Sequence, residues 1–380
     1  MGLFIHRADA ILPLLLFAAL ERHLNYPHVP RLKPVDESRV ARSNFLLAGM
    51  ASMMKLTPKR RWSQFSLRSA LFFVFLVCLA LSLWVVPLER KRRAVVAIEA
   101  LGGSVSYADK PANDDSFPVA VLRPWLPKMY FDEVDRVDLG STQLTDAGLA
   151  PLPELTGLQL LWLDNTQVTD AGLAQLQDLS SLQSLWLDNT QVTDAGLAHL
   201  QRLTGLQELS LEYTKVTDAG LSHLQGLTEL QELSLHGTQV TDAGLSHLQG
   251  LTRLQELSLV GTQVKNDGLA HLHRLRDLQR VYISDTQVAD AGLANLPILK
   301  RLQDLSLSDT QVTDVGLAHL QGLTGLQYLY LNNTQITDAG LAHLHGLTGL
   351  RELSLIDTQT TDAGLIQIST ALPKCRIYWP

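Results

Sequence analysis

Two consecutive segments of 24 residues decide the fold. Residues 158–181 read LQLLWLDNTQVTDAGLAQLQDLSS, and residues 182–205 read LQSLWLDNTQVTDAGLAHLQRLTG. The same pattern recurs along the chain, and its most regular member is a threonine. This threonine occurs ten times at intervals of 24 residues: Thr142, Thr166, Thr190, Thr214, Thr238, Thr262, Thr286, Thr310, Thr334 and Thr358. Such a period indicates one structural unit stacked on copies of itself, because a single unit of this size cannot bury its own apolar face.

Each repeat combines the apolar pattern of a strand with that of a helix. In the second repeat, Leu161 and Leu163 alternate as in a short strand, whereas Leu173 and Leu176 follow at helical spacing. Thr169 lies between the two patterns and is suited to cap the helix, with an aspartate in its first turn. One strand and one helix in every repeat, connected in one direction, predict a parallel sheet with right-handed crossovers.

The different spacings of strands and helices predict the curvature of the stack. Neighbouring strands lie ~4.8 Å apart, whereas packed helices need ~8–10 Å. The stack must therefore bend, with the sheet on its concave side and the helices on its convex side. The sequence predicts an α/β solenoid, shaped as a horseshoe, with a parallel concave sheet, outer helices and one N-terminal transmembrane helix.

The apolar run before the repeats predicts the transmembrane helix. Residues 70–86 read ALFFVFLVCLALSLWVV, and the predicted span covers residues 70–88. About 20 apolar residues cross a hydrocarbon core ~30 Å thick; the alternative interpretation is a buried core helix. Basic clusters of nearly equal size flank the run on both sides, so the positive-inside rule gives almost no preference for either membrane orientation. A short basic tail before a long domain favours a single-pass membrane protein with its repeats on the non-cytoplasmic side.

The other segments complete the predicted organisation. They are an irregular tail at residues 1–54, a basic juxtamembrane segment at 55–69, a linker with N-terminal cap at 89–133, ten repeats at 134–372 and a C-terminal cap at 373–380. Translation is expected to begin at Met53 or Met54, since the amino-acid sequence that follows is typical of the start of a membrane anchor. Within the linker, residues 94–101 are predicted as a helix and residues 104–107 as a short strand.

Three repeated residues receive structural interpretations. The threonine column, such as Thr166, is expected to bond backbone groups of the adjacent repeat. Gly172 and its equivalents stand in the first helical turn, where glycine costs ~1 kcal/mol relative to alanine, so a close approach of helix and strand backbones is predicted. The recurring histidines are interpreted as solvent-facing and not as a metal ladder, because helices ~8–10 Å apart do not bring ligands to ~2 Å from one zinc ion. They are His199, His223, His247, His271, His319 and His343.

These motifs resemble the leucine-rich repeat family, over residues 134–372. The T-D-A-G-L phrase is similar to the subclass with an outer α-helix, found in F-box-type and ribonuclease-inhibitor-like arrays. The order of segments, with F-S-L-R at residues 65–68 and E-A-L-G-G at residues 99–103, is similar to membrane-anchored repeat proteins of planctomycete bacteria. The chain departs from the family by using threonine where asparagine or cysteine is usual. No F-box, kinase or other effector domain is evident, which weakens any signalling role that the resemblance implies.

The sequence carries no enzyme motif. Neither H-E-x-x-H, G-x-S-x-G, a phosphate-binding glycine loop nor a pair of C-x-x-C motifs occurs. Asp170 has an equivalent in almost every repeat, which fits helix capping and not a unique acid/base pair. We therefore expect a protein without catalysis, cofactor or metal site. Its net charge of −7 does not suit a nucleic-acid partner.

Eleven of the 36 outward strand positions in repeats two to ten are acidic. Only Arg280 among them is basic. The acidic residues are Asp164, Asp188, Glu208, Glu212, Glu232, Glu256, Asp285, Asp304, Asp309, Glu352 and Asp357. Tryptophan and tyrosine, the residue types that dominate binding interfaces, are interleaved with them. The predicted partner-binding residues are Trp162, Trp186, Glu208, Glu212, Tyr213, Glu232, Glu256, Tyr282, Tyr328 and Tyr330.

These positions predict a basic protein or peptide as the partner on the concave face, because an acidic field attracts cations and repels nucleic acid. Two alternatives come from other classes. The array could be a structural spacer of the cell envelope, with the glutamates serving only solubility. It could also be an adaptor subunit, which the resemblance to F-box-type proteins alone implies.

Overall fold

The computed structural model describes residues 72, 75, 86–108 and 132–379. Residues 86–108 and 132–379 belong to one compact unit. The predicted tail, the basic segment and most of the predicted span at residues 70–88 lie outside the described residues. Among the residues that are described, no helix combines the length and the apolar character needed to cross a bilayer.

A single sheet runs through the described part of the chain, with its strands in chain order from β1 to β12. The strands are β1 Ser104–Tyr107, β2 Val134–Asp138, β3 Leu160–Trp162, β4 Ser184–Trp186, β5 Glu208–Ser210, β6 Glu232–Ser234, β7 Glu256–Ser258, β8 Arg280–Tyr282, β9 Asp304–Ser306, β10 Tyr328–Tyr330, β11 Glu352–Ser354 and β12 Arg376–Tyr378. From β2 onward neighbouring strands are parallel, and from β3 each residue pairs with the residue 24 positions later, as Trp162 does with Trp186. The predicted parallel sheet is confirmed.

The outer side of each repeat is tighter than predicted. A four-residue α-helix is followed in most repeats by a short 3-10 helix, so the expected single α-helix is only partly correct. The α-helices are α6 Asp170–Leu173, α7 Asp194–Leu197, α8 Asp218–Leu221, α9 Asp242–Leu245, α10 Asn266–Leu269, α11 Asp290–Leu293, α12 Asp314–Leu317, α13 Asp338–Leu341 and the longer α14 Asp362–Ala371. The 3-10 helices are η3 Asp146–Leu149, η4 Leu152–Glu154, η5 Ala198–Arg202, η6 Ser222–Leu224, η7 Ser246–Gly250, η8 Ala270–Arg274, η9 Leu296–Ile298, η10 Ala318–Gly322 and η11 Ala342–Leu344. Within 24 residues the chain must return to the next strand, which leaves no room for a longer helix.

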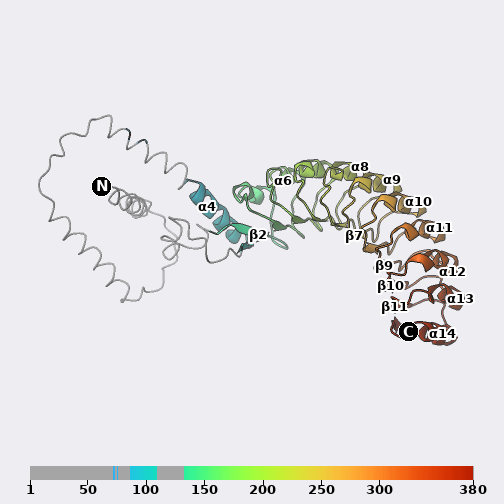
Figure 1. Ribbon diagram of the computed structural model, residues 1–380. Coiled ribbons are helices and arrows are strands. Elements are labelled where there is room, and N and C mark those ends of the chain that lie inside the picture. The colour runs from blue at the N-terminus through green and yellow to red at the C-terminus, as the bar shows by residue number, and fades with distance from the viewer. Residues whose placement is uncertain (1–71, 73–74, 76–85, 109–131, 380) are drawn as a thin grey trace, which may run out of the picture. The chain divides into compact units, whose positions relative to one another are not determined.

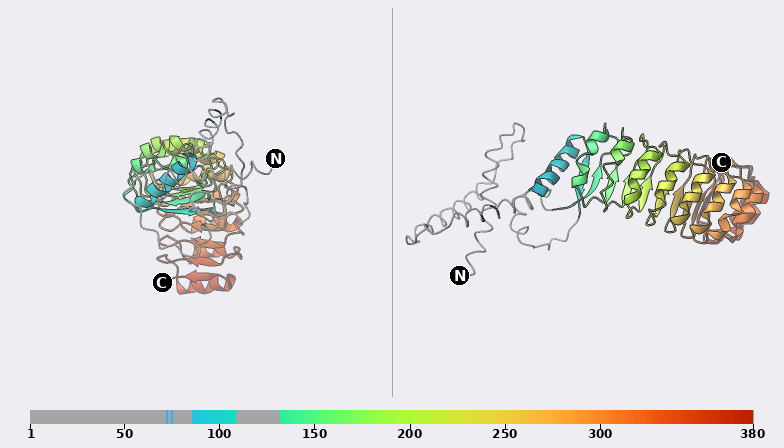
Figure 2. Two further views of the ribbon diagram at one scale, coloured as in Figure 1. Left: turned by 90° about the vertical axis from the view of Figure 1, so that its left-hand side faces the viewer. Right: turned by 90° about the horizontal axis from the view of Figure 1, so that it is seen from above.

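The leucines of the two sides meet in one continuous core. Leu161 from β3 and Leu173 from α6 are both fully buried, and the equivalent residues of the other repeats join them in one cluster. Each buried leucine contributes roughly 1.5–3 kcal/mol. The array of repeats curves with its strands on the inner side and its helices on the outer side (Figure 1). Seen from above, the helical segments lie side by side along the array (Figure 2).

Both ends of the array carry a distinct element. At the N-terminal end, α4 Val86–Ala100 buries Ala94, Val95 and Ile98, and β1 pairs antiparallel with β2. The predicted helix at residues 94–101 and the predicted strand at 104–107 are confirmed, although the described helix already includes the basic residues from Arg90 onward. At the C-terminal end, β12 adds one more parallel strand, as the departure from the repeat pattern there predicts.

A pair of aspartate and threonine closes most junctions between repeats. The Asp170 carboxylate accepts hydrogen bonds from the backbone N of Thr193 at 2.7 Å and from its Oγ1 at 2.6 Å. Thr193 in turn caps its own helix, because its Oγ1 accepts a hydrogen bond from the N of Ala195. The predicted N-cap is confirmed, and the aspartate also has a role that the sequence analysis did not foresee. It joins each helix to the following one.

The repeated glycine makes room for that aspartate. A Cβ atom on Gly172 would lie 2.5 Å from Oδ1 of Asp146 and 2.9 Å from Cδ1 of Leu149 in the preceding repeat. The predicted close approach of helix and strand backbones is therefore wrong. The steric need is real, but it comes from the carboxylate of the neighbouring repeat.

The threonine column bonds within its own repeat. The Oγ1 of Thr166 donates to the carbonyl oxygen of Leu163 at 2.6 Å, three residues earlier in the chain. The expected bond to the adjacent repeat is wrong, because the intervening residue Asn165 has a φ of 55°, and this left-handed turn folds the hydroxyl back towards its own strand. The column stabilises the turn that ends each strand.

Candidate functional site

The register of the strands arranges the concave side chains in three rows. In β3 to β11 the first and third residues lie on the concave side of the sheet, while the central leucine or valine is buried. The first row contains Glu208, Glu232, Glu256, Arg280, Asp304, Tyr328 and Glu352. The middle row contains Trp162, Trp186, Ser210, Ser234, Ser258, Tyr282, Ser306 and Tyr330. The third row follows two residues after the middle row and contains Asp164, Asp188, Glu212 and His236.

Two tryptophans stand together at one end of the middle row. The rings of Trp162 and Trp186 are stacked, with centroids 4.9 Å apart and an angle of 23° between their planes. Both side chains are half-buried, because each ring covers one face of the other. Both tryptophans are among the predicted partner-binding residues, and the structure brings them together as one aromatic surface.

Tyrosines occupy the other aromatic positions. Tyr282, Tyr328 and Tyr330 are half-buried on β8 and β10. Burial, with the nearby carboxylates of Glu256 and Asp304, raises the pKa of Tyr282 to about 12. The Tyr282 phenol therefore remains protonated at neutral pH and can donate a hydrogen bond to a ligand.

Tyr213 lies on the turn after β5 and not in a strand. Its side chain is 53% exposed, and its backbone has a φ of 55°, which is unusual for a bulky residue. The ring packs against His236 at a centroid distance of 4.6 Å, and its hydroxyl lies 2.9 Å from Nε2 of that histidine. A Cβ on Gly237 would meet the Tyr213 ring, so the glycine is needed for this arrangement.

The four predicted glutamates differ in their surroundings. Arg280 forms ion pairs with Glu232, at 2.8 Å, and with Glu256. Burial, followed by the neighbouring Glu256, raises the pKa of Glu232. Glu212 accepts a hydrogen bond from Oγ of Ser234 at 2.8 Å. Glu208 has no hydrogen bond or ion pair of its own within the described residues, so it is the most available of the four carboxylates.

Several of the acidic residues have a backbone role that the sequence analysis missed. Asp285, Asp309 and Asp357 all have φ values between 53° and 57°, at the same repeat position as Asn165 and Gly261. Aspartate, asparagine and glycine tolerate this left-handed conformation better than other residues. The recurrence of these three residue types at one repeat position was the sequence signal for the turn. The left-handed backbone explains why aspartate occurs there, so ligand binding is not needed to explain these aspartates.

Asp188 also stabilises the fold. Its carboxylate accepts hydrogen bonds from Oγ of Ser210 and, at 2.9 Å, from the backbone N of Glu212. Burial raises the pKa of this carboxyl above its usual range. Asn332 makes the corresponding bonds to Ser354 and Ile356, so this position ties successive strands together.

The recurring histidines pair with glutamines of the preceding repeat. His223 and His247 each place Nδ1 2.7 Å from the Nε2 of a glutamine 22 residues earlier, Gln201 and Gln225 respectively. The same contact joins Gln249 to His271. In the part of the chain that the structure describes, no group of three or more His, Cys, Asp or Glu residues could hold a metal ion.

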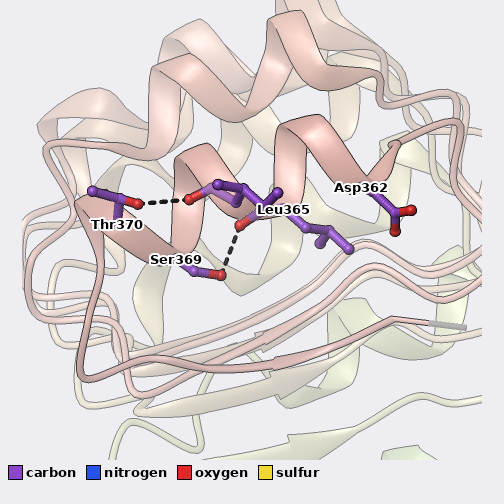
Figure 3. A pocket seen from close by; sticks show the side chains of 5 residues that line it. Asp362, Leu365, Ser369 and Thr370 are labelled. Atoms are coloured by element: carbon purple, nitrogen blue, oxygen red, sulfur yellow. Dashed lines mark hydrogen bonds between the residues drawn. The ribbon is translucent and has the colours of Figure 1, made fainter.

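A shallow pocket lies along α14 at the C-terminal end of the array (Figure 3). Its hydroxyls are engaged by their own helix: Oγ of Ser369 donates to the carbonyl of Leu365 at 2.7 Å, and Oγ1 of Thr370 to that of Ile366 at 2.8 Å. Asp362 and apolar side chains complete the lining. None of these groups forms a nucleophile and base pair, so the concave face remains the better candidate site.

Comparison with known protein families gives a match to part of the repeat array. Residues 300–343 match a family model described as leucine-rich repeats in two copies. No curated protein matches the chain in sequence. The chain is similar to the crystal structure of an internalin C2 from Listeria monocytogenes, with 29% identity, a TM-score of 0.45, and coverage of 56% of this chain and 84% of that one.

Two further solved structures are similar at lower identity. An internalin from Listeria monocytogenes is 22% identical, with a TM-score of 0.40 and coverage of 68% of this chain and 92% of that one. The mouse RP105/MD-1 complex is 22% identical over 60% of this chain and 39% of that one, with a TM-score of 0.49.

Proposed function

Because this chain belongs to the leucine-rich repeat proteins, we propose that its concave face binds a protein or peptide partner without catalysis. Repeat arrays of this kind use extended concave surfaces for binding. The observation that carries the proposal is the stacked pair Trp162 and Trp186, which stands on that face beside carboxylates. Half-buried indole rings in such a setting are typical anchors of an interface.

The charges of the face favour a basic partner. Glu208 and Glu212 flank the middle row next to Trp186, whereas Arg280 forms its ion pairs with Glu232 and Glu256. A cation that approaches the face is therefore attracted first to the β4–β5 region. The same field disfavours nucleic acid.

The proposal includes a membrane anchor at residues 70–88, with the repeats on the non-cytoplasmic side. Its support is the apolar run and the basic residues around it. We expect a reporter enzyme that is active only in the cytoplasm to be inactive when fused after residue 380. Full reporter activity in intact cells would contradict this orientation.

Replacing both tryptophans tests the binding face. Peptides selected from a random library on the full chain are expected to bind the Trp162→Ala/Trp186→Ala variant at least about tenfold more weakly, because hot-spot aromatic residues each contribute ~1 kcal/mol or more. The dissociation constants are measured by isothermal titration calorimetry. Val315→Ala is the matched control, since Val315 is 65% exposed on α12, where most other repeats carry alanine. Unchanged affinity of every selected peptide for the double variant would show that this face is not the binding site.

A further inference from the structure

The side chains around Ser210 form an arrangement that occurs once on the described face. Ser210 pairs in register with Trp186, and Glu208 and Glu212 lie two residues before and after it on the same side. One face of the Trp186 ring covers Trp162, and Ser210, the next residue of the middle row, is buried with its Oγ donating to Asp188. Serine is too small to cover an indole ring. We call Trp186, Glu208, Ser210 and Glu212 the Ser210 site.

An arginine of the chain itself shows what such a surface binds. Arg280 extends along the first row and places its guanidinium between two successive carboxylates, with Nη2 2.8 Å from Oε1 of Glu232 and Nε donating to Glu256. Glu208 is the next carboxylate of the same row, one strand beyond Glu232. Glu232 and Glu256 therefore hold a guanidinium across neighbouring strands, and Glu208 occupies the same register position one strand further along.

The geometry points to recognition of a partner's arginine side chain at the Ser210 site, an inference that rests on the proposed function. A planar guanidinium stacks on an indole face and donates several hydrogen bonds in the same plane, so it can engage Trp186 and Glu208 together. Glu212, held by Ser234, adds negative charge on the opposite side. Lysine, a compact and strongly hydrated charge, makes only part of these contacts.

The neighbouring strands lack one or more of these groups. Ser234 and Ser258 follow serines in the middle row, so no indole stands beside them. Ser354 follows Tyr330, but the position of the second carboxylate is occupied by Ile356. The site is therefore specific to β4 and β5, and this specificity makes it testable.

Fluorine NMR of the full chain, labelled with 5-fluorotryptophan, tests the site. The probe is the pentapeptide acetyl-Gly-Gly-Arg-Gly-Gly-amide, compared with twins that carry lysine or the neutral citrulline. The Trp186 resonance, assigned from the Trp186→Phe variant, is expected to shift saturably with the arginine peptide. Binding should be about threefold weaker for lysine and undetectable for citrulline, in line with an exposed cation–π contact of about 0.5–1 kcal/mol.

Matched variants distinguish binding at the Ser210 site from non-specific electrostatic attraction of the peptide to an acidic protein. Glu208→Gln is expected to weaken binding of the arginine peptide about threefold, and the folded state can be checked from an unchanged Trp162 resonance. Glu229→Gln removes the same charge in the turn before β6, outside the strands, and should leave the affinity unchanged. Equal binding of the arginine and lysine peptides, no saturable shift, or no effect of Glu208→Gln would each overturn the inference.

Different experimental outcomes would contradict the arginine site and the proposed binding function. Library-selected peptides that lack arginine, yet lose affinity in the Trp162→Ala/Trp186→Ala variant, would remove the arginine site and leave the binding face intact. Peptides that bind both proteins equally would remove the binding face itself.

Discussion

Leu269→Ala is expected to lower the free energy of unfolding by about 2–5 kcal/mol and to split unfolding into two transitions. Leu269 is fully buried in α10, and loss of a buried leucine combines lost burial with a cavity. The junctions on both sides of α10 lack the hydroxyl–carboxylate bond that the other described junctions have. Lys265 and Ala289 replace the usual threonine, so only their backbone N atoms bond to Asp242 and Asn266. Since stability in a solenoid depends on contacts between neighbours, the array should separate at this point.

Calorimetry of the full chain measures this effect, and two variants serve as controls. Leu197→Ala removes an equally buried leucine from α7, where complete aspartate–threonine pairs close both junctions, and should shift one transition without splitting it. Asn266→Asp with Ala289→Thr adds the missing hydroxyl–carboxylate bond and should restore a single transition to the Leu269→Ala protein. A single transition in Leu269→Ala without this repair would contradict the idea of a weak junction.

Gly244→Ala is expected to cost about 1–3 kcal/mol, although alanine is ordinarily better than glycine in a helix by ~1 kcal/mol. A Cβ at this position would overlap a carboxylate oxygen of Asp218 and lie 3.1 Å from Cδ1 of Leu221. Asp218 cannot withdraw without losing its bonds to Thr241, of 2.7 Å to the backbone N and 2.6 Å to Oγ1. Urea unfolding followed by circular dichroism gives the difference in free energy.

The same substitution at Gly226 provides the control for Gly244. No heavy atom lies within 4 Å of a Cβ built on Gly226, and its φ is not positive. Gly226→Ala should therefore be neutral or stabilise the protein by up to about 1 kcal/mol, through the reduced freedom of the unfolded chain. If Gly244→Ala were as harmless as Gly226→Ala, the carboxylate would not be the reason for the repeated glycine.

The sequence predicts the fold well because leucine spacing reports burial directly. Leu161 and Leu173 identify the strand and the helix of a repeat, and stacking follows from the period. The contacts between repeats were harder to predict from the sequence. The sequence shows Asp170, Thr193 and Gly196 as separate repeated letters, whereas their shared bond and their steric relation exist only after the repeats are stacked.

The candidate site was predictable in composition but not in detail. Strand alternation places Trp186 and Glu208 on the concave face, and the structure does so. Strand alternation in the sequence could not show that Trp186 stacks on Trp162, or that Arg280 reaches Glu232 two strands away. Side-chain conformation and competition among carboxylates decide these contacts. The aspartates such as Asp309 were misjudged because their alternation with asparagine and glycine was not recognised as a turn signal.

The aspartate–threonine pair also has a consequence for the gene. Each pair takes Asp170 or its counterpart from one repeat and a threonine from the next, 23 residues later. Unequal recombination that inserts or deletes one whole unit therefore brings a donor and an acceptor together again, with the glycine still in place. We therefore expect the array to tolerate changes in length by whole units, whereas a partial unit inserted between the aspartate and its threonine would change their spacing of 23 residues.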